Sequence, residues 1–110
     1  STPIPDAVAY KCLAGEAVGE GIVGLQAVGE VLRTRGKTQG MYGCQSGIWD
    51  RTPEYVRKVV REAWKNSETS HIGGGADHFE AVGRFGTPRW SNSMTKIITI
   101  KNHTFYKSRG

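Results

Sequence analysis

The chain lacks long apolar runs and has few cysteines and prolines, as is typical of an ordinary globular protein. No apolar run approaches the roughly 18 residues that span a bilayer, so we predict no membrane insertion. Only two of its 110 residues are cysteines and four are prolines. The cysteines form neither a C-x-x-C pair nor a zinc pattern, and we expect no metal and no cofactor. There is no internal repeat, so we predict one domain over residues 1–110, with 1–5 as a lead-in. We also expect a monomer.

An excess of acidic residues is also missing. Fifteen lysines and arginines against ten acidic residues give a net charge of +5, which favours a polyanionic partner: nucleic acid, an acidic membrane surface or an anionic cell wall. The densest basic cluster spans residues 57–65 on the polar side of an expected helix, and a solvated face explains it better. The chain shows no nucleic-acid-binding motif, so we predict no nucleic-acid partner. A basic DNA binder remains a rival hypothesis.

The first two thirds of the chain have helical patterns. Asp6 is expected to cap a helix ending near Ala14, and a second helix covers 21–35. Its expected buried stripe is Val23, Ala27, Val28, Val31 and Leu32, with Gln26, Glu30 and Arg33 on the solvated side. Residues 36–51 are expected to form a loop. Thr52-Pro53-Glu54 indicates the start of a third helix, whose apolar stripe includes Trp64.

The last third changes to strand-like patterns. Residues 77–82 alternate loosely, 95–100 are rich in β-branched side chains, and 104–106 can return after a turn at 101–103. No leader of basic and then apolar residues opens the chain, so we expect a secretion signal to be absent or already removed. The predicted fold class is α+β: three main helices, then a small antiparallel sheet, with a cleft between the two parts.

Glu16 is the most informative side chain. It follows the first apolar helical pattern and is bracketed by Gly15 and Gly19, where a carboxyl can adjoin packed side chains and still reach a cleft. Low-dielectric surroundings keep a carboxyl group protonated near neutral pH, and cleavage of a glycosidic bond needs a protonated acid. We therefore consider Glu16 a candidate general acid, although spacing alone favours an ordinary surface glutamate.

Other polar groups have less distinctive surroundings. Glu20 is expected to offset the positive end of the second helix. Glu80 is either a second cleft carboxylate or an exposed strand residue. Asp77 and His78 could bind a metal, but no matching ligand spacing supports one. Cys12, on an apolar helix face, and Cys44, in a loop, either form a disulfide outside the reducing cytoplasm or remain free thiols.

Aromatic side chains supply candidates for sugar binding. Tyr42, Trp49, Phe79, Trp90 and Tyr106 could stack on sugar faces, or simply fill a core. Trp64, at helical spacing, is expected to belong to the core.

Three separate blocks of the chain resemble the SleB-like cell-wall hydrolases, the spore-cortex-lytic type also found among phage lysins. The first block is Gly15-Glu16-Ala17-Val18-Gly19-Glu20. The second runs from Gly24-Leu25-Gln26-Ala27-Val28 to Thr34-Arg35, and the third is Lys101-Asn102-His103-Thr104-Phe105-Tyr106. His78-Phe79-Glu80 and Pro88-Arg89-Trp90 are similar to the phage versions. Val18, Thr34 and Lys101 depart from the usual arginine, asparagine and glycine of these motifs.

The resemblance implies a lysozyme-like fold and cleavage between N-acetylmuramic acid and N-acetylglucosamine, with Glu16 as the catalytic acid and Asn102 and His103 as further substrate-binding candidates. The implied partner is the glycan strand of peptidoglycan, and the implied place of action is the bacterial cell wall, reached by phage delivery or after processing. We expect lytic transglycosylase chemistry with one glutamate. The alternatives are a muramidase that uses a second carboxylate and a non-catalytic glycan-binding or virion structural module.

Overall fold

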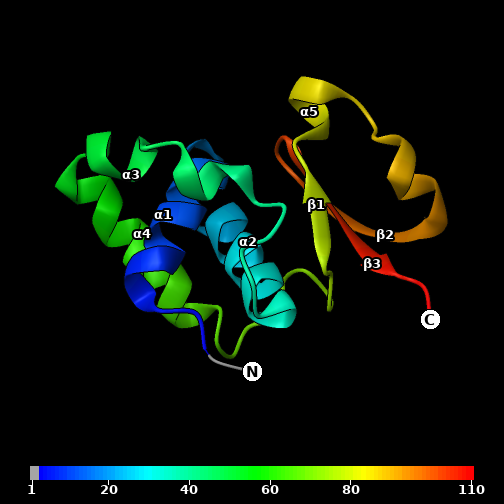
Figure 1. Cartoon of the computed structure of the whole chain (residues 1–110), viewed down its shortest axis with the longest axis horizontal. Helices are drawn as coiled ribbons and strands as arrows, with labels where there is room; N and C mark the ends of the chain where they lie inside the picture. Colours follow the sequence, from blue (N-terminus) through cyan, green and yellow to red (C-terminus); the bar gives the residue numbers. More distant parts are fainter. Residues whose placement is uncertain (1–2) are drawn as a thin grey trace.

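The computed structural model describes residues 3–110 and has an α+β architecture in two parts (Figure 1). The helical part comes first in the chain and the sheet part follows, as expected. The helical part contains α1 (Asp6–Ala17), η1 (Val18–Glu20), α2 (Gly21–Arg35), η2 (Tyr42–Gln45), α3 (Ile48–Arg51) and α4 (Glu54–Asn66). The sheet part contains β1 (His78–Glu80), α5 (Val82–Phe85), η3 (Arg89–Ser93), β2 (Met94–Ile100) and β3 (His103–Ser108).

The first helix is longer than its sequence pattern predicted. It continues past Ala14 to Ala17, so Glu16 lies in its last turn. Asp6 is not the cap: Pro5 holds that position, and Asp6 is the first helical residue. The Asp6 carboxylate instead accepts a hydrogen bond of 2.8 Å from the indole N–H of Trp64. This bond joins the start of α1 to the end of α4.

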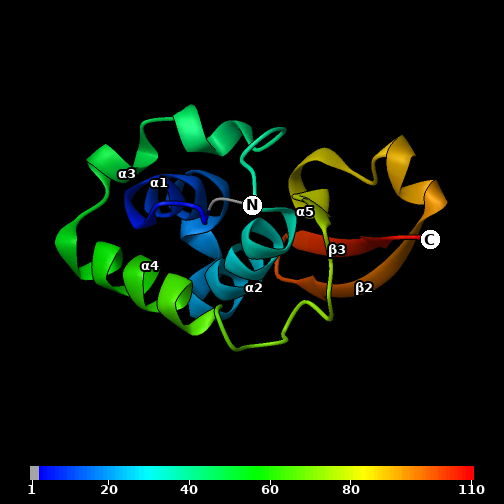
Figure 2. The same ribbon diagram turned by 60° about the horizontal axis from the view of Figure 1, so that its bottom comes forward.

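The core lies among α1, α2 and α4, and α2 stands between the other helices and the sheet (Figure 2). Ala27, Val28, Val31 and Leu32 are fully buried, as the helical stripe predicted. Val23, the first expected member of the stripe, is 48% exposed, so that prediction was wrong; Leu25, two residues later, is buried in its place. Trp64 is buried, as predicted.

Glu30 and Arg33, the two charged residues assigned to the solvated side of α2, in fact make contacts within the fold. Glu30 is buried and accepts backbone hydrogen bonds from Ile72 at 2.9 Å and Gly73 at 2.8 Å, and a third from the Ser70 hydroxyl. The Arg33 guanidinium lies 3.6 Å from the centre of the Trp64 ring. A buried carboxylate needs such donors; here they come from the connector after α4, which helical periodicity does not contain.

The sheet has the order β1-β3-β2, with β3 in the centre and both pairings antiparallel. The turn before β3 contains Lys101, whose φ of 50° is the only positive value at a non-glycine residue within 3–110. Residues 36–51 are less irregular than expected, since η2 and α3 lie inside them. Among residues 3–110 no helix has both the length and the apolar character needed to cross a membrane.

Candidate active site

A groove of about 860 Å³ lies between the two parts of the molecule. The helical part contributes the end of α1, η1 and the η2 segment. The sheet part contributes β1, α5, and the turn that enters β3. The cleft predicted between helices and sheet is therefore present, and Glu16, Glu20 and Glu80 all line it.

Glu16 is half-buried on the helical wall of the groove. One of its carboxyl oxygens, Oε1, accepts a hydrogen bond of 2.8 Å from the backbone N–H of Gly43 in η2. Within the part of the chain that the structure describes, Oε2 has no hydrogen-bond partner. The carboxyl group is thus held at one oxygen and free at the other, on a side chain whose backbone is helical.

The close contact between α1 and η2 explains this geometry. A Cβ atom added to Gly15 would lie 1.7 Å from the carbonyl oxygen of Gly43, and one added to Gly43 would lie 2.6 Å from the carbonyl carbon of Gly15. Both distances are impossible for real atoms, so two glycines are required for the backbones to meet. The disulfide between Cys12 and Cys44 closes the same contact, across a sequence separation of 32. The cysteine alternative left open by the sequence is thereby decided in favour of the bridge.

Glu20 has a different role from the one predicted at the helix end. It is buried, and its carboxylate accepts hydrogen bonds from the Asn102 backbone N–H at 2.9 Å, the Asn102 side-chain amide at 3.4 Å and His103 Nδ1 at 2.7 Å. Burial by itself raises the pKa of Glu20, but the hydrogen bond and positive charge of His103, with the Asn102 bonds, outweigh it and lower the pKa below its ordinary value of 4.5. Glu20 is therefore ionised, and its carboxylate joins the helical part to the sheet part by hydrogen bonds.

Glu80 lies on the sheet wall of the same groove. It is half-buried in β1, and its Oε1 accepts a hydrogen bond of 3.0 Å from the backbone N–H of Ala81. Glu80 is therefore a second carboxylate in the groove besides Glu16, and unlike Glu20 it is not bonded to His103 or Asn102. No group of three or more metal-ligating side chains occurs anywhere in residues 3–110.

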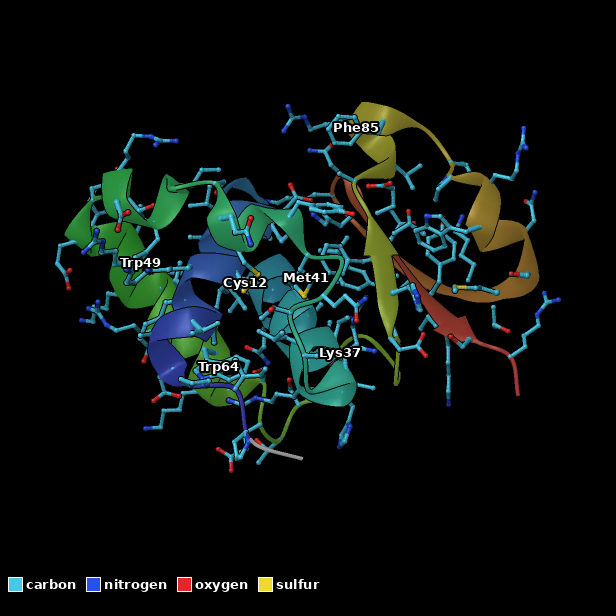
Figure 3. The ribbon with its side chains drawn as sticks, viewed as in Figure 1. Cys12, Lys37, Met41, Trp49, Trp64 and Phe85 are labelled. Carbon is cyan, nitrogen blue, oxygen red and sulfur yellow. A yellow bond between two sulfur atoms is a disulfide. The ribbon has the colours of Figure 1, made fainter. Side chains whose placement is uncertain are left out.

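The predicted sugar-binding residues divide into two sets. Those that line the groove are Tyr42, Phe79, Trp90, Asn102 and His103. Two others do not belong to its lining. Trp49 lies on the side of the helical part away from the sheet (Figure 3), where its ring packs 5.3 Å from that of Tyr10. Tyr106 is buried, with its ring 5.3 Å from that of Trp90. These two residues fill and support the fold.

Sequence reasoning missed Phe85 and did not assign His78 a place in the groove. Phe85, on α5, is 70% exposed and lines the groove. His78 also lines the groove, and its Nδ1 lies 3.0 Å from Asp77 Oδ1. Burial alone raises the pKa of Asp77, but hydrogen bonds from His78 and Ser108 and the charge of His78 lower it below 3.8. The pairing suits an oriented imidazole and not the metal site considered from the sequence.

A second hollow of about 570 Å³ lies between the start of α1 and α4. Its basic side chains include Arg61, which forms an ion pair with Glu54, and Arg33, which donates hydrogen bonds to Ser67 and to the Trp64 carbonyl. These two charges are used within the fold. The hollow also contains carboxyl groups and aromatic rings, but it is smaller than the groove and does not include Glu16 or Glu80. The groove, with Glu16 and Glu80 on facing walls, is therefore the better candidate site.

Comparison with known proteins adds no further constraint. No family model matches the chain, and no curated protein or solved structure is significantly similar to it.

Proposed function

We propose that this protein cleaves the glycosidic bond between N-acetylmuramic acid and N-acetylglucosamine in peptidoglycan, with Glu16 as the acid, on a lysozyme-like fold. The observation that carries the proposal is the Glu16 carboxyl, held by the Gly43 N–H at one oxygen and free at the other on the wall of a groove of about 860 Å³. A groove of that size is large enough for sugar rings. Its place of action would be the bacterial cell wall.

The assignment of the acid follows from what the other carboxylates do. Glu20 is held ionised by His103 and Asn102, so it cannot donate a proton at neutral pH. Glu80 lies on the opposite wall and bonds to the adjacent backbone. Glu16 is left with one oxygen committed and one oxygen available, which suits a group that must give up a proton and later accept one.

The proposed reaction is that of a lytic transglycosylase. As the glycosidic C–O bond breaks, the leaving oxygen takes the proton of Glu16 and the anomeric carbon becomes oxocarbenium-like. The C6 hydroxyl oxygen of the same muramic acid residue then bonds to that carbon, and its proton passes to the Glu16 carboxylate. The product is a 1,6-anhydro ring, no water is consumed, and Glu16 returns to its protonated form.

Hydrolysis is the alternative, and Glu80 is the observation that favours it. A carboxylate on the facing wall could activate water or stabilise the oxocarbenium-like carbon, as in muramidases. Mass spectrometry of digested peptidoglycan separates the two reactions. Anhydromuramic ends support the transglycosylase; reducing ends that have gained one water, together with a large loss of rate in E80Q, would establish the muramidase.

The test of the whole proposal is the E16Q variant in a turbidity assay on purified cell walls. We expect a loss of about a hundredfold or more, the usual scale for removal of a general acid, with an unchanged far-ultraviolet circular dichroism spectrum. E62Q is the matched control, because Glu62 is an exposed glutamate of α4 outside the groove. Full activity in E16Q would refute the assignment, and glycan binding by the wild type without any cleavage would indicate the non-catalytic module.

A further inference from the structure

We infer that Phe85 and Tyr42, on opposite walls of the groove, form an aromatic pair that holds the pyranose rings of a glycan strand. Tyr42 belongs to η2 in the helical part and Phe85 to α5 in the sheet part, and both line the groove. Figure 3 shows Phe85 on α5, at the top of the sheet part in this view. The inference takes its ligand class from the proposed function, but it concerns binding and not the chemical step.

The two rings are unusually open to solvent. Tyr42 is 86% exposed and Phe85 70%, so neither contributes much to the core. Exposed aromatic rings in a concave surface cost solvation free energy in the free protein, and they mark binding sites more often than scattered surface apolar residues do. Trp90, 38% exposed, adds a third ring to the same groove.

Phe85 is held on a rigid turn. Its own backbone N–H donates to the Ala81 carbonyl at 2.9 Å, and the Gly83 N–H donates to the Asn102 carbonyl at 3.0 Å. A Cβ atom at Gly83 would lie 2.4 Å from Asn102 Oδ1, so α5 packs directly on the turn that leads into β3. The Arg84 guanidinium lies 5.2 Å from the centre of the Phe85 ring. The backbone that carries the exposed Phe85 ring is therefore held in place before a ligand arrives.

Tyr42 is held in a comparable way. It begins the η2 turn, in which the next residue donates its N–H to Glu16 and Cys44 is joined to α1 by the disulfide. Met41, on the other side of Tyr42, is buried in the core. The chain is therefore anchored on both sides of a ring that itself makes little contact with the protein.

The chemistry of these two walls suits a hexosamine polymer. One face of a pyranose ring presents C–H bonds, which pack on an aromatic face while the hydroxyl and amide groups at its edge stay hydrated. Because the backbone that carries each ring is held in the free protein, binding has to order only the side chains and not the segments that bear them. The polar side of the sugar can meet the carboxyl groups of Glu16 and Glu80 in the same groove.

Binding is tested in the E16Q background, so that cleavage does not interfere, by cosedimentation with insoluble peptidoglycan and by titration with a soluble β-1,4-linked N-acetylglucosamine hexamer. We expect F85A and Y42A each to weaken both interactions about tenfold, the scale of one lost stacking contact with its buried area. F85W should retain binding and F85L should not, because stacking needs a flat ring. Y55A is the matched control: Tyr55 is 77% exposed on α4, away from the groove.

Wild-type affinity in F85A and Y42A would overturn the inference, as would an equal loss in Y55A. The outcome is separable from that of the proposed function. If the wild type leaves peptidoglycan intact but binds it through Phe85, the aromatic pair stands and the glycosidase fails. If the wild type cleaves peptidoglycan and F85A has an unchanged KM, the glycosidase stands and the aromatic pair fails. Unchanged urea midpoints in both variants would show that the loss is not one of folding.

Discussion

Reduction of the Cys12–Cys44 disulfide should lower the free energy of unfolding by about 3 to 4 kcal/mol. The bridge joins residues separated by 32 positions, and the loop-entropy relation gives about 3.7 kcal/mol at 25 °C for a loop of that length. For a domain of this size the whole stability is about 5 to 15 kcal/mol, so the reduced protein would lose a large share of it.

The assay is urea unfolding of the wild-type protein with and without a phosphine reductant, followed by tryptophan fluorescence. Reduction leaves both sulfur atoms in place, so the core volume around the fully buried Cys12 hardly changes. This makes reduction a cleaner perturbation than substitution. The oxidised protein should also have the smaller m-value, because a cross-linked unfolded chain exposes less surface. The variant C12A/C44A is the control, and the reductant should not affect it.

A difference below about 1 kcal/mol would refute the entropic reasoning, and two titratable thiols in the unfolded, unreduced protein would refute the bridge itself. The bridge also bears on the site, because Cys44 follows the residue whose N–H holds Glu16. We therefore expect the proposed wall-lytic activity to decline in the reduced protein under conditions where circular dichroism shows it still folded. Full activity of the folded, reduced protein would mean that η2 stays in place without the bridge.

Two further predictions concern the groove walls. G15A should destabilise the protein by about 1 to 3 kcal/mol through overpacking, because its Cβ would overlap the Gly43 carbonyl. This loss would exceed the usual gain in stability from alanine in a helix. G19A, whose Cβ would meet nothing within 4 Å, should be neutral in the same urea assay. The lowered pKa of Glu20 means that the native state binds fewer protons than the unfolded chain, so its stabilisation is present above pH 4.5 and disappears as the pH falls below that value. Urea unfolding at a series of pH values should show this loss in the wild type and a flatter acid limb in E20Q; identical limbs would contradict the role of the His103 contact.

Local patterns in the sequence were sufficient for much of the fold. The bounds of α2 agree with the prediction at both residues, Gly21 and Arg35, because apolar spacing and the glycine after the helix are both local signals. The strands near 95–100 and 104–106 were found for the same reason, since β-branched residues flank a turn. The position of Glu16 at the end of the first helix was predicted from the local pattern. Its selection as the acid was not, because spacing alone favoured an ordinary surface glutamate and the resemblance to the SleB-like hydrolases decided the choice.

The errors share a physical cause, which is contact between residues far apart in the chain. Glu30 and Glu20 were assigned to solvent or to a helix end because their donors lie about 40 and 80 residues later, in Ile72, Gly73 and His103. For Trp49, where the sequence left sugar stacking and core packing open, the deciding contact with Tyr10 is also distant in the chain. Periodicity describes which side of a helix is apolar, but it does not show which backbone will later reach a charged side chain on the other side.

The groove owes its shape to two ties of different chemistry, one on each side of Glu16 in the chain. The first is covalent and steric: the disulfide and the paired glycines bring η2 against α1 and place the Gly43 N–H on Glu16. The second is ionic: Glu20, four residues further on, holds the turn before β3 and with it α5. Because the two ties respond to different agents, a reductant should act on the Tyr42 wall and acid on the Phe85 wall. In Y42A the remaining aromatic ring is Phe85, on the wall that Glu20 supports, whereas in F85A that ring is already missing. Lowering the pH should therefore reduce the proposed glycan affinity more in Y42A than in F85A.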